Sequence, residues 1–453
     1  MNQKNDFTRG PILMPLLTFA GPVLLAMLLQ SLYGAVDLLI VGRFADSANV
    51  SAVSSGAQMM MLVLSIIMGL SMGATILIGK QIGEKKPDDA GRTVGAAIMM
   101  FAIFALIMTA ILVASSRQLA ALVNAPVEAF EQTVSYIRIC SLGFLFMTAF
   151  NVLGAIFRGI GNSQIPLLTV FIASLSNIFG DLLLVAVFHM GASGAAIATV
   201  AAQLLSVILS ILIIRRIELP FRFKVSYIRF DKKLVSSILR LGFPLALQDF
   251  LVSVSFMVIL AVVNKLGVNE SAGVGVAERL TGFIMLVPSA LSQSVAAFVA
   301  QNYGAMRMDR AKKTLFYAVG ISLIFGICMS TTTFLFGDRM ASIFSNDPAA
   351  VAAAFEYLKS YAIDCLLTPF FFCYTGYFNG IQKTTFVMAQ GIIGGVFIRV
   401  PLCLLFYTIK PVSLFRIGLA TPCSSMLQII LCLAYYYWLA RKDKRNLQAR
   451  VSS

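Results

Sequence analysis

The sequence predicts an all-α membrane protein with twelve transmembrane helices, arranged as two six-helix lobes related by a pseudo-two-fold axis along the membrane normal. Three observations predict this fold class. Hydrophobic residues make up 59% of the chain and charged residues only 12%, whereas charged residues are about 25% of an ordinary globular domain. Apolar runs long enough to cross a bilayer recur along the chain. The second half also repeats the first at a nearly constant spacing.

Each predicted helix is an apolar run of about twenty residues or more, bounded by short polar segments. The first lobe, residues 1–214, contains runs at 12–41, 53–79, 93–115, 136–157, 165–188 and 193–214. The second lobe, residues 238–440, contains runs at 238–264, 273–300, 315–336, 357–378, 386–408 and 417–440. An even number of helices in each lobe gives both lobes the same orientation in the membrane, so the axis that relates them should run along the membrane normal.

Basic residues orient the chain because most of them lie in alternate segments between the runs. These segments include the N-terminus with Lys4 and Arg9, a basic linker at 215–237 and a basic tail at 441–453. The positive-inside rule then places both termini in the cytoplasm. We interpret the linker, which contains Arg222, as a topology determinant that also touches anionic lipid; a specific headgroup site is the alternative. The net charge of +15 is thus explained without nucleic-acid binding.

The internal repeat has an offset of 221 residues over most of its length. The matching pairs include Val53 and Val274, Gly83 and Gly304, Asp88 and Asp309, Tyr136 and Tyr357, and Gly159 and Gly380. In the first run of each lobe the offset is 222, where Pro22 meets Pro244. Two such lobes predict a central cavity that opens alternately to the two sides of the membrane.

Ionisable residues inside a membrane are costly, so each one suggests a function. Asp37 lies deep in the first run, and Asp181 lies in the fifth run, four residues after Asn177 and on the same helical face. At the repeat offsets Asp37, Asn177 and Asp181 correspond to apolar residues, Ile259, Ile398 and Leu402. A purely architectural need would be expected in both lobes.

This asymmetry predicts a cation-coupling site in the first lobe, with H⁺ favoured over Na⁺. A carboxyl group held away from water resists ionisation, and a second carboxylate nearby strengthens that resistance. Gain or loss of a proton would then bias a bistable lobe. The alternative is a structural role, in which the acids are hydrogen-bonded to Asn177, Asn151 or Thr199.

The second lobe carries its own charges in or near its apolar runs, namely Asp249, Glu278, Arg279, Asp364 and Arg399. Internal ion pairing is one interpretation. The other is that an acid faces the cavity and attracts cationic cargo, for which Asp249 and Asp364 are the main candidates.

Other cavity and hinge candidates lie in the first run of each lobe. Gln30 and Tyr33 precede Asp37 by one to two turns and are candidates to face the cavity. Pro22 and Pro244 each remove a backbone hydrogen bond, which predicts a helix kink that either couples to Asp37 or is static.

No cofactor, metal site or enzymatic activity is predicted. The seven cysteines have no CxxC spacing, and His189 is the single histidine. Gly159 and Gly161 form only a GxG turn, and no Walker motif is present. An intramembrane enzyme with Asp37 and Asp181 as an aspartyl dyad is a further alternative, but their runs carry no catalytic motif.

Four local runs, together with the two-lobe repeat, resemble the multidrug and toxic compound extrusion (MATE) family over roughly residues 10–440. The runs are GPVLLAMLLQSLYGAVDLLIVGRF, FRGIGNSQIP, NIFGDLLLV and GASGAAIATVAAQ. The resemblance implies two lobes in a V arrangement and cation-coupled antiport of organic, often cationic, compounds. It also implies a coupling role for Asp37, with Asn177, Asp181, Thr199 and Asn151 in the same cluster. One branch of the family has a glutamate about eight residues after the second-lobe proline; Val252 stands there, which puts a cation site of that kind in doubt.

The sequence therefore predicts a secondary active transporter that exports small organic, cationic or amphipathic compounds by H⁺-coupled antiport. We expect a multi-pass protein of the cell inner (plasma) membrane that binds drugs and lipid, acts as a monomer and binds no nucleic acid. The alternative is a lipid-linked oligosaccharide flippase of the same broad superfamily, for which Arg279 and Arg399 would make the cavity basic.

Overall fold

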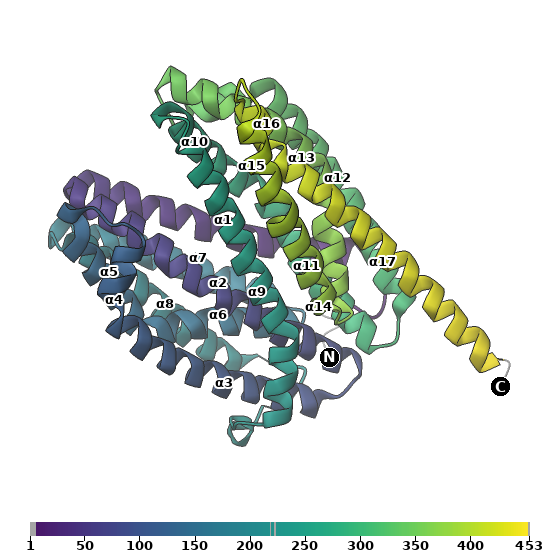
Figure 1. The fold of residues 1–453 in the computed structure, drawn as a ribbon. Helices are drawn as coiled ribbons and strands as arrows, with labels where there is room; N and C mark the ends of the chain where they lie inside the picture. The colour runs from purple at the N-terminus through teal and green to yellow at the C-terminus, as the bar shows by residue number, and fades with distance from the viewer. Residues whose placement is uncertain (1–5, 218, 222, 452–453) are drawn as a thin grey trace. The chain divides into compact units, whose positions relative to one another are not determined.

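Helices make up nearly all of the chain that the structure describes. The computed structural model describes residues 6–217, 219–221 and 223–451, and it gives only the backbone for 443–451. Lys4 and Arg222 of the predicted basic segments lie outside the described residues. No strand occurs in these ranges (Figure 1), so the all-α class predicted from the sequence is confirmed.

Helix bounds follow the predicted runs and extend a little beyond them into the polar segments. The first half contains α1 (Leu13–Phe44), α2 (Ser47–Gly83), α3 (Pro87–Ala114), α4 (Ser116–Leu122), α5 (Phe130–Leu142), α6 (Phe144–Gly159), α7 (Gln164–Asp181) and α8 (Gly191–Arg216). The second half contains α9 (Lys232–Val263), α10 (Val268–Ile284), α11 (Leu286–Gly304), α12 (Met308–Ser342), α13 (Pro348–Gly380), α14 (Thr384–Ile392), α15 (Val400–Thr408), α16 (Leu414–Gly418) and α17 (Ala420–Val451). Two π-helical segments, η3 (Leu182–Val187) and η5 (Ile393–Arg399), continue α7 and α14.

Within the described residues, ten helices are long and apolar enough to cross a membrane, and a bent pair makes an eleventh. The pair is Val127–Leu142 and Phe144–Gly159, bent by 54°. The predicted run 136–157 is therefore not one straight helix. Gly143 stands at the bend, where a Cβ atom would lie 2.4 Å from the Val200 side chain. The break thus lets the chain pass close to α8.

The remaining predicted run, 357–378, lies within α13. This helix has 33 residues, which is more than enough to span a bilayer. It carries Asp364 and a series of Tyr, Ser and Thr residues, so it is less apolar than the other spans. The twelve helices predicted from the sequence include α13, which is not among the ten helices and the bent pair described above.

Side-chain caps and turn residues explain where the long helices begin. Asp46 caps α2 by accepting a hydrogen bond from the backbone N–H of Asn49 at 2.9 Å. Pro87 occupies the first turn of α3, where its missing N–H costs no helical bond, and Asp88 and Asp89 in the same turn complement the helix dipole.

The chain divides into two compact units. The first unit consists of Met1–Leu247, Ala297–Ala311 and Gly380–Gln382, and the second consists of Gln248–Ala296, Lys312–Asn379 and Lys383–Ser453. The start of α9 and the end of α11 therefore pack with first-half helices. The sequence does not indicate this assignment.

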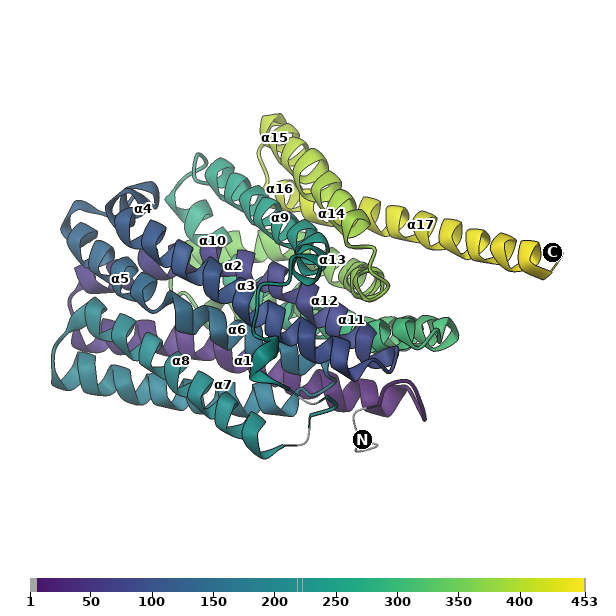
Figure 2. The ribbon, with the colours of Figure 1, turned by 90° about the horizontal axis from the view of Figure 1, so that it is seen from below.

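In the first unit, α7 packs against both α1 and α8 (Figure 2). Elsewhere in this unit, glycines on α2 allow close helix crossings. A Cβ atom on Gly69 would lie 2.4 Å from Ala246 Cα, and one on Gly73 would lie 2.5 Å from the Ile238 carbonyl oxygen. Only glycine fits at such crossings, because the neighbouring atoms are backbone.

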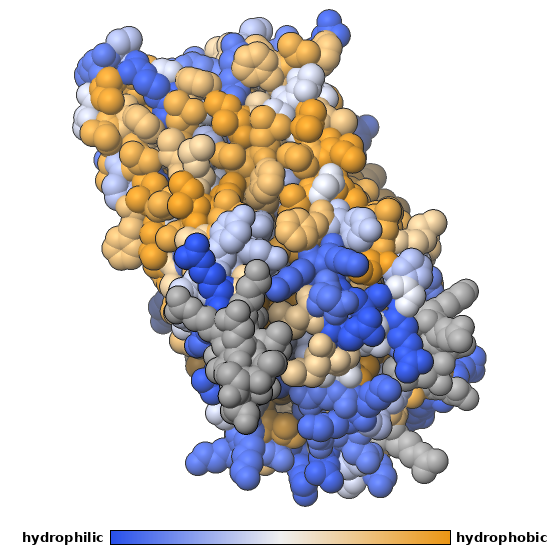
Figure 3. Space-filling model, turned by 90° about the vertical axis from the view of Figure 1, so that its right-hand side faces the viewer, coloured by the Kyte–Doolittle hydropathy of each residue, from blue (hydrophilic) through white to orange (hydrophobic). Residues whose placement is uncertain are grey.

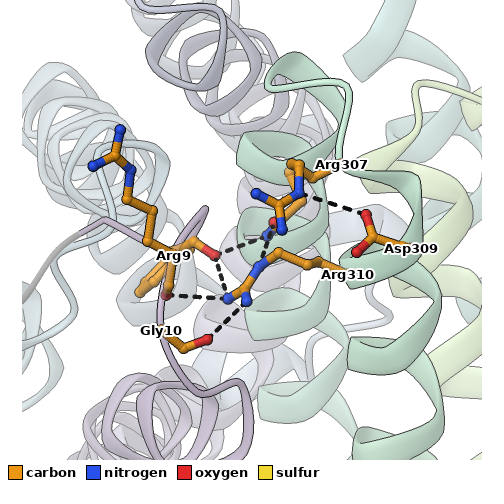
Figure 4. Close-up of polar contacts among 7 residues, drawn as sticks. Arg9, Gly10, Arg307, Asp309 and Arg310 are labelled. Atoms are coloured by element: carbon orange, nitrogen blue, oxygen red, sulfur yellow. Dashed lines mark hydrogen bonds and ion pairs between the residues drawn. The ribbon is translucent and has the colours of Figure 1, made fainter.

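The N-terminal segment, residues 6–12, is tied to the first turns of α12 by Arg310 (Figure 4). The Arg310 guanidinium donates hydrogen bonds to the carbonyl oxygens of Gly10 at 2.7 Å, Phe7 at 3.1 Å and Arg9 at 3.2 Å. The Phe7 ring stacks on Phe298 with 4.6 Å between centroids. All these residues belong to the first unit.

The second unit has an apolar core and an aromatic cluster. Ile259, Val274, Leu358 and Ile417 are fully buried in the core. In the aromatic cluster, the rings of Phe386 and Tyr435 stack at 3.9 Å between centroids.

The protein surface is strongly apolar. On the face shown in Figure 3, hydrophobic side chains dominate the upper and middle part, and hydrophilic side chains are concentrated in the lower part, with some at the top edge. Exposed helical residues such as Leu39, Met61, Phe179 and Phe397 are each at least 66% exposed. Lipid is the environment in which such a surface is stable.

Candidate functional site

The acidic residues singled out in the sequence meet inside the first unit. Asp37 comes from α1, and Asn177 and Asp181 come from one face of α7. Their side chains are enclosed, with exposed fractions of 5% for Asp37, 1% for Asn177 and 0% for Asp181. Asp181 ends α7 where the π-helical segment η3 begins, and π-helical turns are frequent at functional sites.

The two carboxyl groups are neighbours. The Asp37 carboxyl lies within hydrogen-bonding reach of the side chains of Asp181, Thr199 and Asn177. The amide nitrogen of Asn177 donates to the Thr199 hydroxyl at 3.4 Å. The cluster therefore joins α1, α7 and α8 through polar contacts.

Three of the four carboxyl oxygens of the acid pair lack a hydrogen-bond donor. Among the described residues, no N–H or O–H group is placed to donate to either carboxyl oxygen of Asp181 or to Oδ1 of Asp37. Two carboxylates can bond to each other only through a proton on one of them. The arrangement can therefore hold one proton between two helices.

A small pocket of about 10 Å³, roughly the room for one water molecule, adjoins the acid pair. Its lining residues come from α1, α6, α7 and α8, and they are Tyr33, Phe150, Val170, Ala173, Asn177, Thr199, Ala202 and Gln203. Asn177 and Thr199 belong to both the pocket wall and the acid cluster. Tyr33 and Gln203 interact through their side chains.

The other first-half residues predicted for the coupling site, the cavity and the helix kinks lie outside the pocket lining. Asn151 is half-buried, and its amide donates to the Met147 carbonyl oxygen of its own helix at 2.8 Å. Gln30 is half-buried on α1 and does not line the pocket. Pro22 lies inside α1 and Pro244 inside α9, and each helix continues through its proline.

Two second-half charges are buried together in the second unit. Asp364 on α13 and Arg399 at the end of η5 are 2% and 5% exposed, and they interact electrostatically. The Arg399 guanidinium donates to the Ser255 hydroxyl at 3.0 Å and lies over the Phe256 ring at 4.3 Å from its centroid. No carboxylate of the described chain lies within ion-pair distance of Arg399.

The other second-half candidates are more accessible. Glu278 on α10 is half-buried, whereas Asp249 on α9 and Arg279 on α10 are exposed. Of the two predicted cargo-attracting acids, Asp249 can therefore be reached from outside its unit, and Asp364 cannot.

Sequence reasoning missed Gln203 and Phe150 as pocket residues. Gln203 follows Thr199 by four residues on α8, so the two share a helical face. That spacing could have been used to predict Gln203 as a neighbour of Thr199 in the site. Phe150 carries no such signal because phenylalanines are common throughout this chain.

Comparison with known proteins identifies similar chains. Residues 22–183 and 244–405 match the sequence model of the MatE family. The chain is 25% identical over 435 residues to the "Probable multidrug resistance protein YoeA" of Bacillus subtilis (strain 168), covering 94% of both chains. It is 25% identical over 397 residues to the "Multidrug export protein MepA" of Staphylococcus aureus (strain NCTC 8325 / PS 47), covering 85% of this chain and 86% of that one.

Solved structures show the same fold. The structure described as "Crystal structure of MATE in complex with MaL6" has a TM-score of 0.91 at 19% identity, covering 98% of this chain and 100% of that one. "Outward-facing conformation of a multidrug resistance MATE family transporter of the MOP superfamily" has a TM-score of 0.90 at 20% identity, covering 96% and 97%.

Proposed function

The chain belongs to the MatE family, and from this premise we propose that it is a multidrug efflux transporter that exports small organic cations or amphipathic compounds in exchange for H⁺. The relatives described above are named multidrug resistance or export proteins. None of them is described as a flippase, so the flippase alternative gains no support. Alternating access between two lobes is the mode of transport that we propose.

The enclosed contact between Asp37 and Asp181 carries the proposal of proton coupling. A single proton joins two carboxyl groups, three of whose four oxygens lack another donor among the described residues. It also removes one of two like charges in a water-poor place. Loss of that proton makes the two carboxylates repel each other. Because Asp37 belongs to α1 and Asp181 to α7, this repulsion acts between helices and changes how they pack.

We favour H⁺ over Na⁺ because the two carboxyl groups are already in contact. A proton fits between two oxygens at hydrogen-bond distance, whereas a metal ion needs room for several oxygen ligands around it. The same pair could take Na⁺ only after moving apart.

Gradient-driven transport in proteoliposomes tests this function. Ethidium is the cargo, and a proton or a sodium gradient is imposed across the vesicle membrane. We expect the proton gradient to drive transport by the wild type and by Asp338→Asn, which neutralises an exposed carboxyl on α12. We expect Asp37→Asn and Asp181→Asn to reduce it at least about tenfold.

Two results would overturn parts of the proposal. Undiminished proton-driven transport by both Asp37→Asn and Asp181→Asn would remove the coupling assignment. A response to sodium alone would change the coupling ion. Both termini are proposed to be cytoplasmic, and a green fluorescent protein fused to the C-terminus should therefore fluoresce in cells.

A further inference from the structure

A line of exposed side chains runs along α17 in the second unit. At intervals of four residues it consists of Met426, Ile430, Ala434, Trp438 and Lys442. All five are exposed, and the exposed fractions of Met426, Ile430 and Trp438 are 57%, 56% and 53%. Residues four apart are neighbours on a helix and form a ridge inclined to its axis. The five side chains therefore form one continuous outer row, which we call the α17 row.

The chemistry of the α17 row changes in one direction. Met426, Ile430 and Ala434 are apolar, Trp438 is amphipathic and Lys442 is cationic. A phospholipid has the same order of acyl chain, ester-linked glycerol and charged headgroup. Tryptophan is enriched at the level where the hydrocarbon core meets the headgroups, and a lysine stem packs on apolar surface while its ammonium reaches the polar layer. The α17 row therefore matches the polarity of one leaflet.

The length of the α17 row also matches a leaflet. Met426 and Lys442 are 16 positions apart, which at about 1.5 Å per residue corresponds to about 24 Å along the helix. Half of a bilayer, with its headgroups, is about 20–23 Å thick. A phospholipid lying along the row would therefore reach from a headgroup at Lys442 to a chain end near Met426.

Neighbouring rings fix the orientation of Trp438. Its ring stacks on Tyr435 with 5.5 Å between centroids, and Tyr435 stacks on Phe386 of α14 at 3.9 Å. Helices α14 and α17 pack against each other (Figure 2). The Lys442 ammonium lies over the Trp438 ring, 5.1 Å from its centroid, which is a cation–π distance. The protein itself thus holds the ring and the ammonium together, which lowers the entropic cost of ordering them around a ligand.

The positive charge at this end of α17 calls for an anionic partner. Arg441 and Lys442 are exposed, and neither lies within ion-pair distance of a carboxylate in the described part of the chain. Residues 441–445 contain four basic residues and one acidic residue. Basic residues that directly follow a membrane helix attract anionic lipid. A zwitterionic lipid offers the same phosphate but carries its own cation, so it complements this charge less well.

We propose that the α17 row is a binding site for one anionic phospholipid. Its phosphate pairs with Lys442, its glycerol region lies against Trp438, and one acyl chain follows Ile430 and Met426. This inference goes beyond the proposed export function and does not depend on the exported compound or the coupling ion. Ordinary lipid contact would cover the apolar part of the row with any phospholipid, so the preference for an anionic headgroup distinguishes the site.

The fluorescence of Trp438 tests the inference, because this residue is the single tryptophan of the chain. The purified full-length protein is reconstituted into phosphatidylcholine vesicles that contain phospholipid with brominated acyl chains, which quenches a tryptophan in contact with it. Quenching by brominated phosphatidylglycerol and by brominated phosphatidylcholine gives the ratio of their binding constants at Trp438. We expect a ratio of about five in favour of phosphatidylglycerol, the effect of roughly one basic residue at an anionic membrane surface.

Two variants of Lys442 separate charge from packing. Lys442→Gln removes the charge and keeps the stacked rings, and it should lower the ratio at least about twofold. Lys442→Arg keeps the charge and should keep the ratio. Lys232→Gln is the matched control, because Lys232 is also exposed but begins α9 in the first unit; it should leave the ratio unchanged.

Four results would overturn the inference. They are equal quenching by the two brominated lipids in the wild type, absence of quenching by both, an unchanged ratio in Lys442→Gln, and an equal fall of the ratio in Lys232→Gln. The last result would show a general attraction of the basic protein for anionic lipid instead of a site. The measurement needs neither cargo nor an ion gradient, so its outcome is separate from that of the transport assay.

Discussion

Gly83 and Gly304 occupy equivalent positions in the internal repeat, and each lies against the backbone of the helix that carries the other. A Cβ atom on Gly83 would lie 1.9 Å from the Gln301 carbonyl oxygen, and one on Gly304 would lie 2.0 Å from the Lys80 carbonyl oxygen. Lys80 and Gln301 are also repeat equivalents at the same offset of 221. The contact between α2 and α11 is therefore reciprocal, as a local two-fold relation requires.

Substitution of Gly83 should be destabilising because backbone atoms leave no room for a side chain. We expect Gly83→Ala to lower the free energy of unfolding by roughly 1–3 kcal/mol, measured by thermal unfolding in detergent. Gly275→Ala is the control, since no atom lies within 4 Å of a Cβ atom at that position on α10. Alanine there should be neutral or slightly stabilising. A Gly83→Ala protein as stable as the wild type would contradict the close crossing.

The contact between the acids can be tested through stability as well as transport. Asp181→Asn places an amide N–H donor beside Asp37 and should keep stability near that of the wild type. Asp181→Leu removes the carboxyl group that faces Asp37. We expect the free energy of unfolding of Asp181→Leu to be about 1–3 kcal/mol lower than that of Asp181→Asn. Asp338→Leu, at an exposed position, is the control, and it should change the free energy of unfolding little. Equal stability of Asp181→Asn and Asp181→Leu would mean that the carboxyl groups do not depend on each other.

The cap of α2 should give a pH-dependent contribution to stability. Hydrogen bonds from the backbone N–H of Asn49 at 2.9 Å and from its side-chain amide at 2.8 Å lower the pKa of Asp46 below its ordinary value of 3.8. A depressed pKa in the folded state means that the stabilisation is fully present above pH 3.8 and is lost as the pH falls through the lower, folded-state value.

We therefore expect Asp46→Ala to lower the melting temperature at neutral pH and to approach the wild-type curve at the acid end of a pH series. The Asn49 side chain also accepts a hydrogen bond from the Ala192 N–H at 2.7 Å, so loss of the cap should loosen the start of α8 too. Asp88→Ala, at an exposed position in the first turn of α3, is the control. A difference in melting temperature that stayed constant down to the acid limit would argue against a charged cap.

Arg310 should determine whether the N-terminal segment is held in place. Its planar guanidinium reaches three backbone carbonyl oxygens at once, which a lysine ammonium cannot do from one position. We expect Arg310→Lys to speed amide hydrogen exchange in residues 6–12 several-fold, measured by mass spectrometry. Arg307→Lys is the matched control, because Arg307 is exposed and pairs with Asp309 at 3.6 Å on the surface. Unchanged exchange in Arg310→Lys would show that other contacts hold the segment.

Much of the fold could be predicted because its main determinant is local. Membrane spans depend on runs of apolar residues of a fixed length, and such runs can be identified in a sequence without knowing their neighbours. The bend at Gly143 was not predictable in this way, because it depends on the approach of Val200 from another helix. The site residues also divide into those recognisable from the local sequence and those that depend on contacts between helices. Asp37 and Asp181 stand out because acids are rare in apolar runs, whereas Gln203 gains its importance from a pocket that four helices build.

The sequence by itself determined that this chain is an all-α membrane protein with an internal repeat and acids in only one half, since composition, run length and offset are properties of the chain alone. Only the tertiary structure decided that Asp37 and Asp181 touch, that Asn151 bonds within its own helix and that Arg310 binds the N-terminal segment. The contacts of Asp37 and of Arg310 join residues more than a hundred positions apart. They depend on the helix packing that brings such residues within a few ångströms, and no local pattern in the sequence records that packing.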